Sequence, residues 1–277
     1  MMKGDQNGCS TDCPIHLLSR LTFGEIEREI ARFPAMVLPL GGSEPYGSEG
    51  ALGIASACSE AVAAALSRRH AMLMAPTLHY GCSTPYTAFG GAAGVNPRTF
   101  TNALCEILRR FRRQGIELVV IIDPLFDNGP AIDKAVNRLK KWDRNLHILI
   151  FGLQRDERLR AFIARRSGLW GPGRSEFAML SLASCIDPGL IRGTGAGREN
   201  GASANPERYN RWRRRGADPE QFRALFPEGT VTGAGGRYDA DTGRELFQYG
   251  MTLLDETIAP FLPVPGRKGL AQEFKPE

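Results

Sequence analysis

The stretch ELVVII, residues 117–122, decides the fold. Its four successive Val and Ile residues favour a β-strand, and an unbroken apolar run is typical of a strand buried on both faces of a parallel sheet. A helix is predicted before it over residues 97–113, opened by Pro97 and ended by Gly115. A second helix over about residues 131–141 and the strand HILIFGL, residues 147–153, are predicted after it.

The same alternation extends toward the N-terminus. Residues 22–33 place Phe23, Ile26, Ile30 and Phe33 at helical spacing, and Pro34 ends the helix. A strand at MVLPL (36–40), an Ala-rich helix over 54–69 and a short strand over 71–76 follow. Strands that alternate with helices indicate parallel βαβ units. The sequence therefore predicts an α/β fold: a single domain with a mostly parallel β-sheet flanked by helices, an α/β/α sandwich.

Composition excludes several classes of protein. The 277 residues are 42% hydrophobic and 23% charged, with a net charge of +5, so the chain is not of the disordered type. No run of about 18 apolar residues is present, which excludes a membrane span. The opening MMKGDQNGCSTDC lacks the apolar stretch of a signal peptide. Six scattered cysteines do not form a disulfide framework, so we expect a reducing cytoplasm.

The ends of the chain and one internal stretch differ from the rest. We expect a flexible tail over 1–20, the α/β domain over 21–265 with a surface excursion over about 192–229, and a second tail over 266–277. Cys9 and Cys13 in the first tail allow either a zinc site or a tail with two thiols, and the sequence favours the latter. The segment RWRRR, residues 211–215, either grips a phosphate or carboxylate, or is a solvated helix end with Trp212 packed inward, the favoured interpretation.

Three loops are candidates for the functional site. They cover residues 41–53, 77–95 and 123–130, and each is rich in Gly, Pro, Tyr and small polar residues. Each follows a predicted strand, and the loops after the carboxyl ends of parallel strands build the sites of such folds. We therefore expect the three loops to meet at one edge of the sheet.

The loops, in this order, resemble motifs of the creatininase (creatinine amidohydrolase) family. LPLGGSEPYGSEGALGIA (38–55) is similar to V-P-x-G-S-x-E-Q-H-G-P-H-L-P-L-x-T-D, and PTLHYGCSTPYTAFGGA (76–92) to P-x-x-Y-G-x-S-x-E-H-x-x-F-P-G-T. VVIIDPLFDN (119–128) is similar to an apolar strand followed by N-G-H-x-x-N, and GAGGRYDADTG (233–243) aligns loosely with a fourth motif. The resemblance covers most of the chain and implies the creatininase-like fold, a metal-dependent amidohydrolase and a hexameric assembly.

The departures concern the metal ligands. The resemblance implies two divalent cations, zinc or manganese, bound by Glu, His and Asp residues of these motifs. Of these positions Glu44 is kept and Asp127 is acidic, whereas the others hold Tyr46, Ala55, Leu125 and the pair Pro85-Tyr86. A further stretch, GPGRSE (171–176), aligns loosely with the family's H-A-G-E-x-E-T-S. Two carboxylates and a phenol do not hold a dinuclear pair, because zinc prefers imidazole or thiolate. We expect no bound metal cofactor.

The altered loops predict a polar pocket. Glu44 and Asp127 are the candidate catalytic groups, and the candidate ligand-binding residues are Tyr46, Tyr86, His79, Cys82 and Asp123. One alternative is that Tyr46 and Tyr86 only fill the vacated cavity. Cys82 is either a nucleophile activated by His79 or, the favoured interpretation, a buried inert thiol.

Three hypotheses of function follow. The first is a creatininase-like protein without metal chemistry that serves as a binding or partner subunit, in a homo-oligomer or beside an active paralogue. The second is an enzyme on C–N bonds, with a small polar amide-type ligand and a metal-free or single-metal site. The third, nucleic-acid binding through RWRRR, has no other support in the sequence, and a membrane partner is not expected.

Overall fold

The computed structural model describes residues 15–125, 127–169, 171–193, 206–214, 216, 218–231 and 238–262. The strands in these ranges are β1 (Ala35–Pro39), β2 (Leu73–Met74), β3 (Leu118–Ile122) and β4 (His147–Phe151). The helices are α1 (Phe23–Arg32), α2 (Ile54–His70), α3 (Pro97–Arg113), α4 (Gly129–Trp142), α5 (Glu157–Ser167), α6 (Gly171–Ile186), α7 (Pro206–Arg214), α8 (Pro219–Leu225) and α9 (Ala240–Ile258). None of the described helices is long and apolar enough to cross a membrane.

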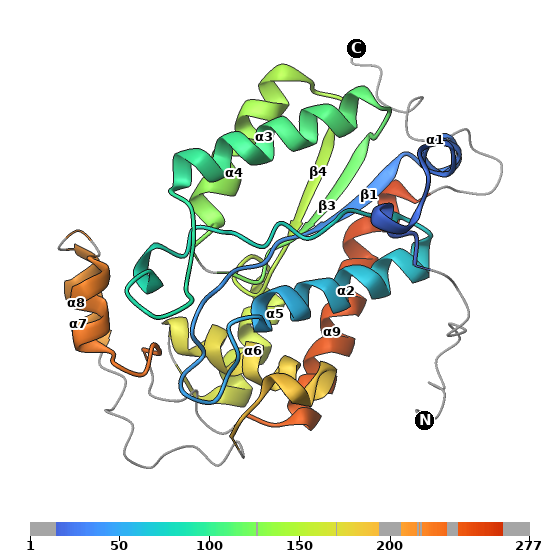
Figure 1. Cartoon of the computed structure of the whole chain (residues 1–277). Coiled ribbons are helices and arrows are strands. Elements are labelled where there is room, and N and C mark those ends of the chain that lie inside the picture. Colours follow the sequence, from blue (N-terminus) through green and yellow to red (C-terminus); the bar gives the residue numbers. More distant parts are fainter. Residues whose placement is uncertain are drawn as a thin grey trace.

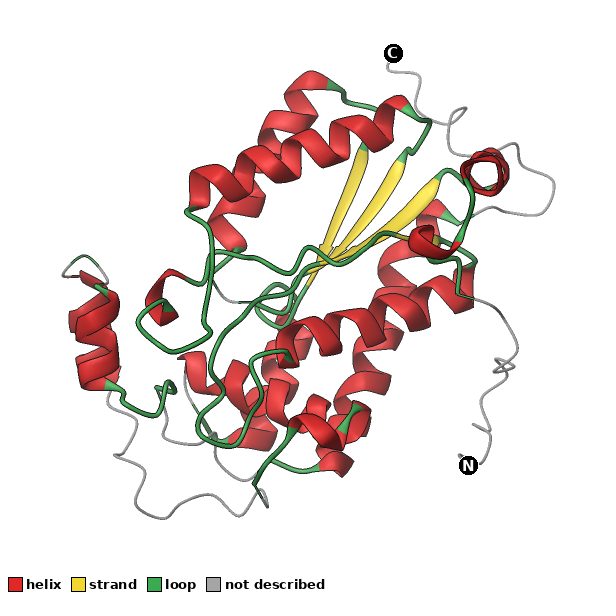
Figure 2. Cartoon of the chain, viewed as in Figure 1, coloured by secondary structure: helices red, strands yellow, loops and turns green. Residues whose placement is uncertain are grey.

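The four strands form one parallel sheet in the order β2-β1-β3-β4. The predicted strand at residues 117–122 is β3, which pairs with β1 and β4 in the middle of the sheet and is buried along its whole length. The predicted α/β fold with a parallel sheet and flanking helices is therefore confirmed. Figure 2 shows the helices on both sides of the strands.

Two apolar cores cover the two faces of the sheet. Alternate strand residues point to opposite faces. Val37 and Val120 join the core beneath α2, α5, α6 and α9, whereas Met36 and Val119 join the core beneath α3 and α4. Figure 1 shows α3 and α4 on one side of the strands and α2, α6 and α9 on the other. This is the three-layer arrangement that the sequence predicts.

Local signals explain the first two long amphipathic helices. Thr22 accepts a hydrogen bond from the backbone of Glu25, whose carboxylate accepts from the Thr22 backbone, a capping box that begins α1. Asn96 caps α3 in a similar way before Pro97. Both helices fall within a residue or two of the predicted bounds.

The predicted surface excursion contains two helices, and residues 194–205 within it lie outside the described residues. α7 and α8 are held by a small aromatic cluster of Tyr209, Trp212, Phe222, Phe226 and Val231. Trp212 is only 3% exposed and its indole N–H donates to the backbone oxygen of Asp218 at 2.8 Å. The inward packing of Trp212 is thus confirmed. The described residues do not include Arg215, the Cys9–Cys13 pair, or the parts of the two predicted tails that lie beyond residues 15–262.

Candidate functional site

The loops that follow β1, β2 and β3 meet at the carboxyl edge of the sheet. Leu40 bridges to Leu78, and Ser43 bridges to Ala93 and donates its hydroxyl to the backbone oxygen of Gly91 at 2.8 Å. Glycine permits this close approach, because a Cβ at Gly42 would lie 2.6 Å from the side chain of Leu125. The expected convergence of the loops is therefore present in the structure.

A small cavity lies where the loops meet. Four of the predicted site residues line it: Glu44, Tyr46, Tyr86 and Asp127. The other residues of its lining are Pro45, Pro124, Leu125, Ser175, Glu176, Met179 and Tyr209. Acidic and phenolic side chains thus supply nearly all of its polar groups.

Glu44 is one of the buried acidic groups of the lining. It is 8% exposed, and one of its carboxyl oxygens accepts a hydrogen bond from the Ser83 hydroxyl at 3.0 Å. Burial raises the pKa of Glu44 to about 8, and the negative charge of Asp127 adds to the rise. Glu44 is therefore mostly protonated at neutral pH and can donate as well as accept a hydrogen bond.

The pKa of Asp127 is raised less than that of Glu44. Burial raises the pKa of Asp127 to about 6, and the positive charge of Arg213 on α7 opposes the rise. At neutral pH Glu44 is thus mostly protonated and Asp127 mostly ionised. Two such groups in one site are able to divide acid and base roles between them.

Asp123 does not line the cavity but supports the loop that carries Asp127. Its carboxylate accepts from the Asn128 amide at 3.0 Å and from the Leu125 backbone at 3.3 Å. The oxygen of the same Asn128 amide accepts from the backbone of Cys82 at 2.8 Å and so joins the second and third loops. Burial raises the pKa of Asp123 to about 7. Its geometry is that of a positioning residue.

Two phenols occupy the positions where the resemblance implies histidines. Tyr46 is 5% exposed, and its hydroxyl has no hydrogen-bond partner among the described residues. Tyr86 closes the 3-10 helix η2 (Thr84–Tyr86) and its ring meets Phe222 of α8 edge-on at 5.3 Å. Burial raises the pKa of both phenols well above the ordinary value, so both remain neutral hydrogen-bond donors.

Neither His79 nor Cys82 lines the cavity. The His79 ring bonds to the Ser56 hydroxyl at 3.0 Å, and its side chain is 58% exposed. Cys82 is buried in the apolar core beneath α3 and α4, where burial raises its pKa to about 12. A thiol with that pKa supplies almost no thiolate at neutral pH, which supports the inert interpretation.

Two further residues reach the cavity from helices. Glu176 of α6 is buried, and its carboxylate accepts from the backbone of Val231 at 2.8 Å. Tyr209 of α7 is buried too, and burial raises its pKa to about 12. The loose alignment at residues 171–176 contained Glu176, but no sequence signal marked Tyr209.

The cavity has a volume of about 30 Å³. Ligand pockets usually have roughly 300–1,000 Å³, and one water needs about 10–15 Å³ measured in this way. The space thus accommodates one or two waters. A larger ligand would require Tyr86 or Tyr209 to move, together with the aromatic cluster of α7 and α8 that holds them.

The lining is poorly suited to a pair of zinc ions. None of its residues offers an imidazole or a thiolate, the donors that zinc prefers. Among the described residues no group of three or more His, Cys, Asp or Glu side chains has the arrangement of a metal site. Glu44 is already engaged by Ser83, and Glu176 by Val231.

Comparison with known proteins gives a consistent result. A family model described as Creatininase, creatinine amidohydrolase, matches residues 19–258. A mutant creatininase complexed with creatine has a TM-score of 0.71 and 18% identity, over 91% of this chain and 100% of that chain. A protein from Bacteroides fragilis NCTC 9343 described as a creatinine amidohydrolase has a TM-score of 0.65 and 15% identity, over 95% of this chain and 99% of that chain. No curated protein sequence matches significantly.

Proposed function

Since this chain belongs to the creatininase family, we propose that it is a member without a dinuclear metal site, which serves as a non-hydrolytic binding or partner subunit of an oligomer. One observation carries the proposal. The cavity where the three family loops meet is lined by carboxyl and phenol oxygens, without an imidazole, and has room for only one or two waters.

The phenols support the loss of cation binding. Tyr46 and Tyr86 stand where the motifs of the family have histidines, and both are neutral because desolvation raises the pKa of each phenol. A neutral phenol is a weak ligand for a divalent cation compared with imidazole or carboxylate.

The family and the small volume of the cavity support the partner role. The resemblance implies a hexamer, and a subunit without its own chemistry would act in a homo-oligomer or beside an active paralogue. The complex of a relative with creatine supports a small polar amide-type ligand. The free thiols Cys58, Cys82, Cys105 and Cys185 support a cytoplasmic location.

A separate observation supports a second candidate function, an enzyme that acts on a C–N bond. Glu44 and Asp127 share the cavity, and their pKa values lie near 8 and 6. A protonated and an ionised carboxyl group in one cavity are suited to acid and base steps on an amide C–N bond. Such an enzyme would have a metal-free or single-metal site and would have to open at Tyr86 or Tyr209.

Hydrolysis assays distinguish the two functions. The purified chain is tested on creatinine and on simple formamides, with chelator and with added zinc or manganese. The first proposal predicts no turnover above the uncatalysed rate under any of these conditions. Turnover that is lost in both Glu44→Gln and Asp127→Asn would establish the second function, and turnover that requires two metals per chain would contradict both.

A further inference from the structure

The strand β4 is an edge strand of the sheet in the part of the chain that the structure describes. It pairs with β3 alone among the described strands, so its other side has no neighbouring strand there. Its residues HILIF are only partly covered: His147, Leu149 and Ile150 are half-buried. Exposed edge strands are sites where another extended segment is able to add.

The hydrogen bonds of β4 identify the groups that face this edge. His147 donates its N–H to the Glu117 oxygen, and Phe151 accepts from the N–H of Asp123. In a parallel ladder alternate residues bond to the same neighbour, so Leu149 also faces β3. Ile148 and Ile150 therefore direct their N–H and C=O groups outward, and these groups have no bonds to other described residues.

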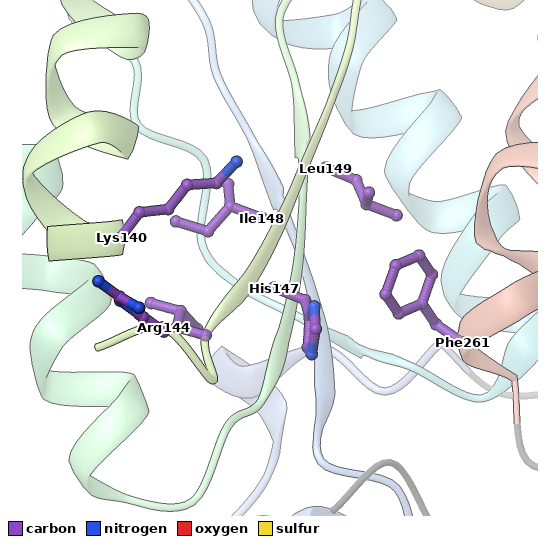
Figure 3. Close-up of a pocket in the computed structure, with 7 residues that line it drawn as sticks. Lys140, Arg144, His147, Ile148, Leu149 and Phe261 are labelled. Atoms are coloured by element: carbon purple, nitrogen blue, oxygen red, sulfur yellow. The ribbon is translucent and has the colours of Figure 1, made fainter. Parts of the chain in front are cut away.

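A cleft of about 370 Å³ lies along this edge. It is lined by Lys140, Arg144, Leu146, His147, Ile148, Leu149 and Phe261. Figure 3 shows Lys140, Arg144 and Ile148 on one side of the strand, and Leu149 and Phe261 on the other. The cleft thus reaches both faces of the strand, as the alternating side chains of an added strand require.

The cleft is positively charged. Lys140, near the end of α4, and Arg144, in the loop before β4, are exposed and form no ion pair with a described residue. None of the lining residues is acidic. The ring of His147 packs against Phe261 with 5.3 Å between centroids, which provides an apolar wall beside the two cations.

We propose that the β4 edge binds an extended acidic segment of a partner protein, which adds a fifth strand and places its carboxylates on Lys140 and Arg144. Main-chain bonds to Ile148 and Ile150 would supply affinity, and the two cations would select acidic sequences. A second copy of β4 is a poorer occupant, because HILIF has no acidic residue to meet the cations.

The proposed site is separate from the cavity of the three loops. The cations flank His147, at the amino end of β4, whereas the loops meet at the carboxyl end of the sheet. Charge reversal at Lys140 and Arg144 therefore leaves the loop cavity intact. The outcome of the following test is independent of the hydrolysis and metal measurements.

A selection from a displayed library of random octapeptides on the full chain tests the proposal. An enriched peptide is then measured by fluorescence anisotropy against three variants. Lys140→Glu combined with Arg144→Glu reverses the charge on two exposed side chains, and Ile150→Pro removes an N–H that β3 does not use. Lys141→Glu is the matched control, an exposed lysine that does not line the cleft.

The expected result is enrichment of acidic, β-branched peptides whose affinity falls about tenfold or more in the charge-reversal variant and in Ile150→Pro. Lys141→Glu should stay within about twofold. Amide exchange at Ile148 and Ile150 should slow when the peptide is bound. The proposal is overturned if no peptide is enriched, if the enriched peptides bind the charge-reversal variant equally well, or if Ile150→Pro instead abolishes self-association of the chain.

Discussion

Replacement of Glu44 by Gln should make the protein more stable, and the gain should grow with pH. The pKa of Glu44 rises from its ordinary value of 4.5 to about 8 on folding because the carboxyl is buried. Below pH 4.5 the carboxyl group is protonated in both the folded and the unfolded chain and does not affect the free energy of unfolding. Between pH 4.5 and 8 the unfolded chain releases the proton that the folded chain keeps, so stability falls by about 1.4 kcal/mol per pH unit.

The full cost reaches roughly 5 kcal/mol above pH 8, as an upper limit, since the folded protein is able to relax around the charge. Gln keeps the oxygen that accepts from Ser83 and has no charge to bury. Its amide adds a cost from an unpaired N–H of about 1–3 kcal/mol that is independent of pH. The slope with pH, rather than the absolute difference, therefore carries the prediction.

Urea unfolding of the wild type and of Glu44→Gln measures this slope. Unfolding is followed by tryptophan fluorescence at several pH values from 5 to 9, with chelator present. We expect the free energy of unfolding of the variant, relative to that of the wild type, to increase by at least about 2 kcal/mol between pH 5 and pH 8. Glu106→Gln, at an exposed position of α3, is the control and should show no such shift. A difference that does not change with pH would show that Glu44 is ionised in the folded protein and would refute the reasoning.

Three other substitutions or reactions test neighbouring features. Tyr46→Phe should change the unfolding free energy by less than about 1 kcal/mol, because its hydroxyl has no partner among the described residues, whereas Tyr46→Ala should cost about 3–5 kcal/mol; equal losses in urea unfolding would contradict this. Gly152→Ala should cost about 1–3 kcal/mol or more, because its Cβ would overlap the backbone oxygen of Asp123, whereas Gly24→Ala, with open space around it, should be neutral or stabilising by thermal melting. Cys82 should resist iodoacetamide at pH 8 in the native state, as mass spectrometry of the modified peptide will show, since burial raises the pKa of its thiol to about 12; rapid native alkylation would rule out the inert interpretation.

The helices and strands with strong local patterns were predictable from sequence. β3 and α3 lie at their predicted places because a Val/Ile run and a Pro-opened amphipathic stretch have few alternative structures. The helix α6 was not predicted. Its sequence GPGRSEFAMLSLASCI is apolar on most sides because α6 packs between α2 and α9, so it lacks the one-sided stripe of a surface helix.

The residues of the candidate site that lie on the three loops were predictable from the sequence. Glu44, Tyr46, Tyr86 and Asp127 follow strands of one parallel sheet, and such loops share an edge whatever their distance along the chain. Tyr209 and Glu176 come from helices whose positions depend on tertiary packing, so sequence spacing gave no clue to their approach. His79 follows β2 as predicted, but its side chain turns toward Ser56 of α2.

Manganese binding measures the central claim most directly. The chain is dialysed to equilibrium against manganese, and the bound metal is measured by plasma mass spectrometry. Manganese is chosen because it prefers oxygen donors, so the thiols of the first tail bind it poorly. Much less than one equivalent per chain, unchanged in Glu44→Gln, is the expected result. Two equivalents per chain that disappear in Glu44→Gln would show that the carboxyl and phenol groups hold a cation pair after all.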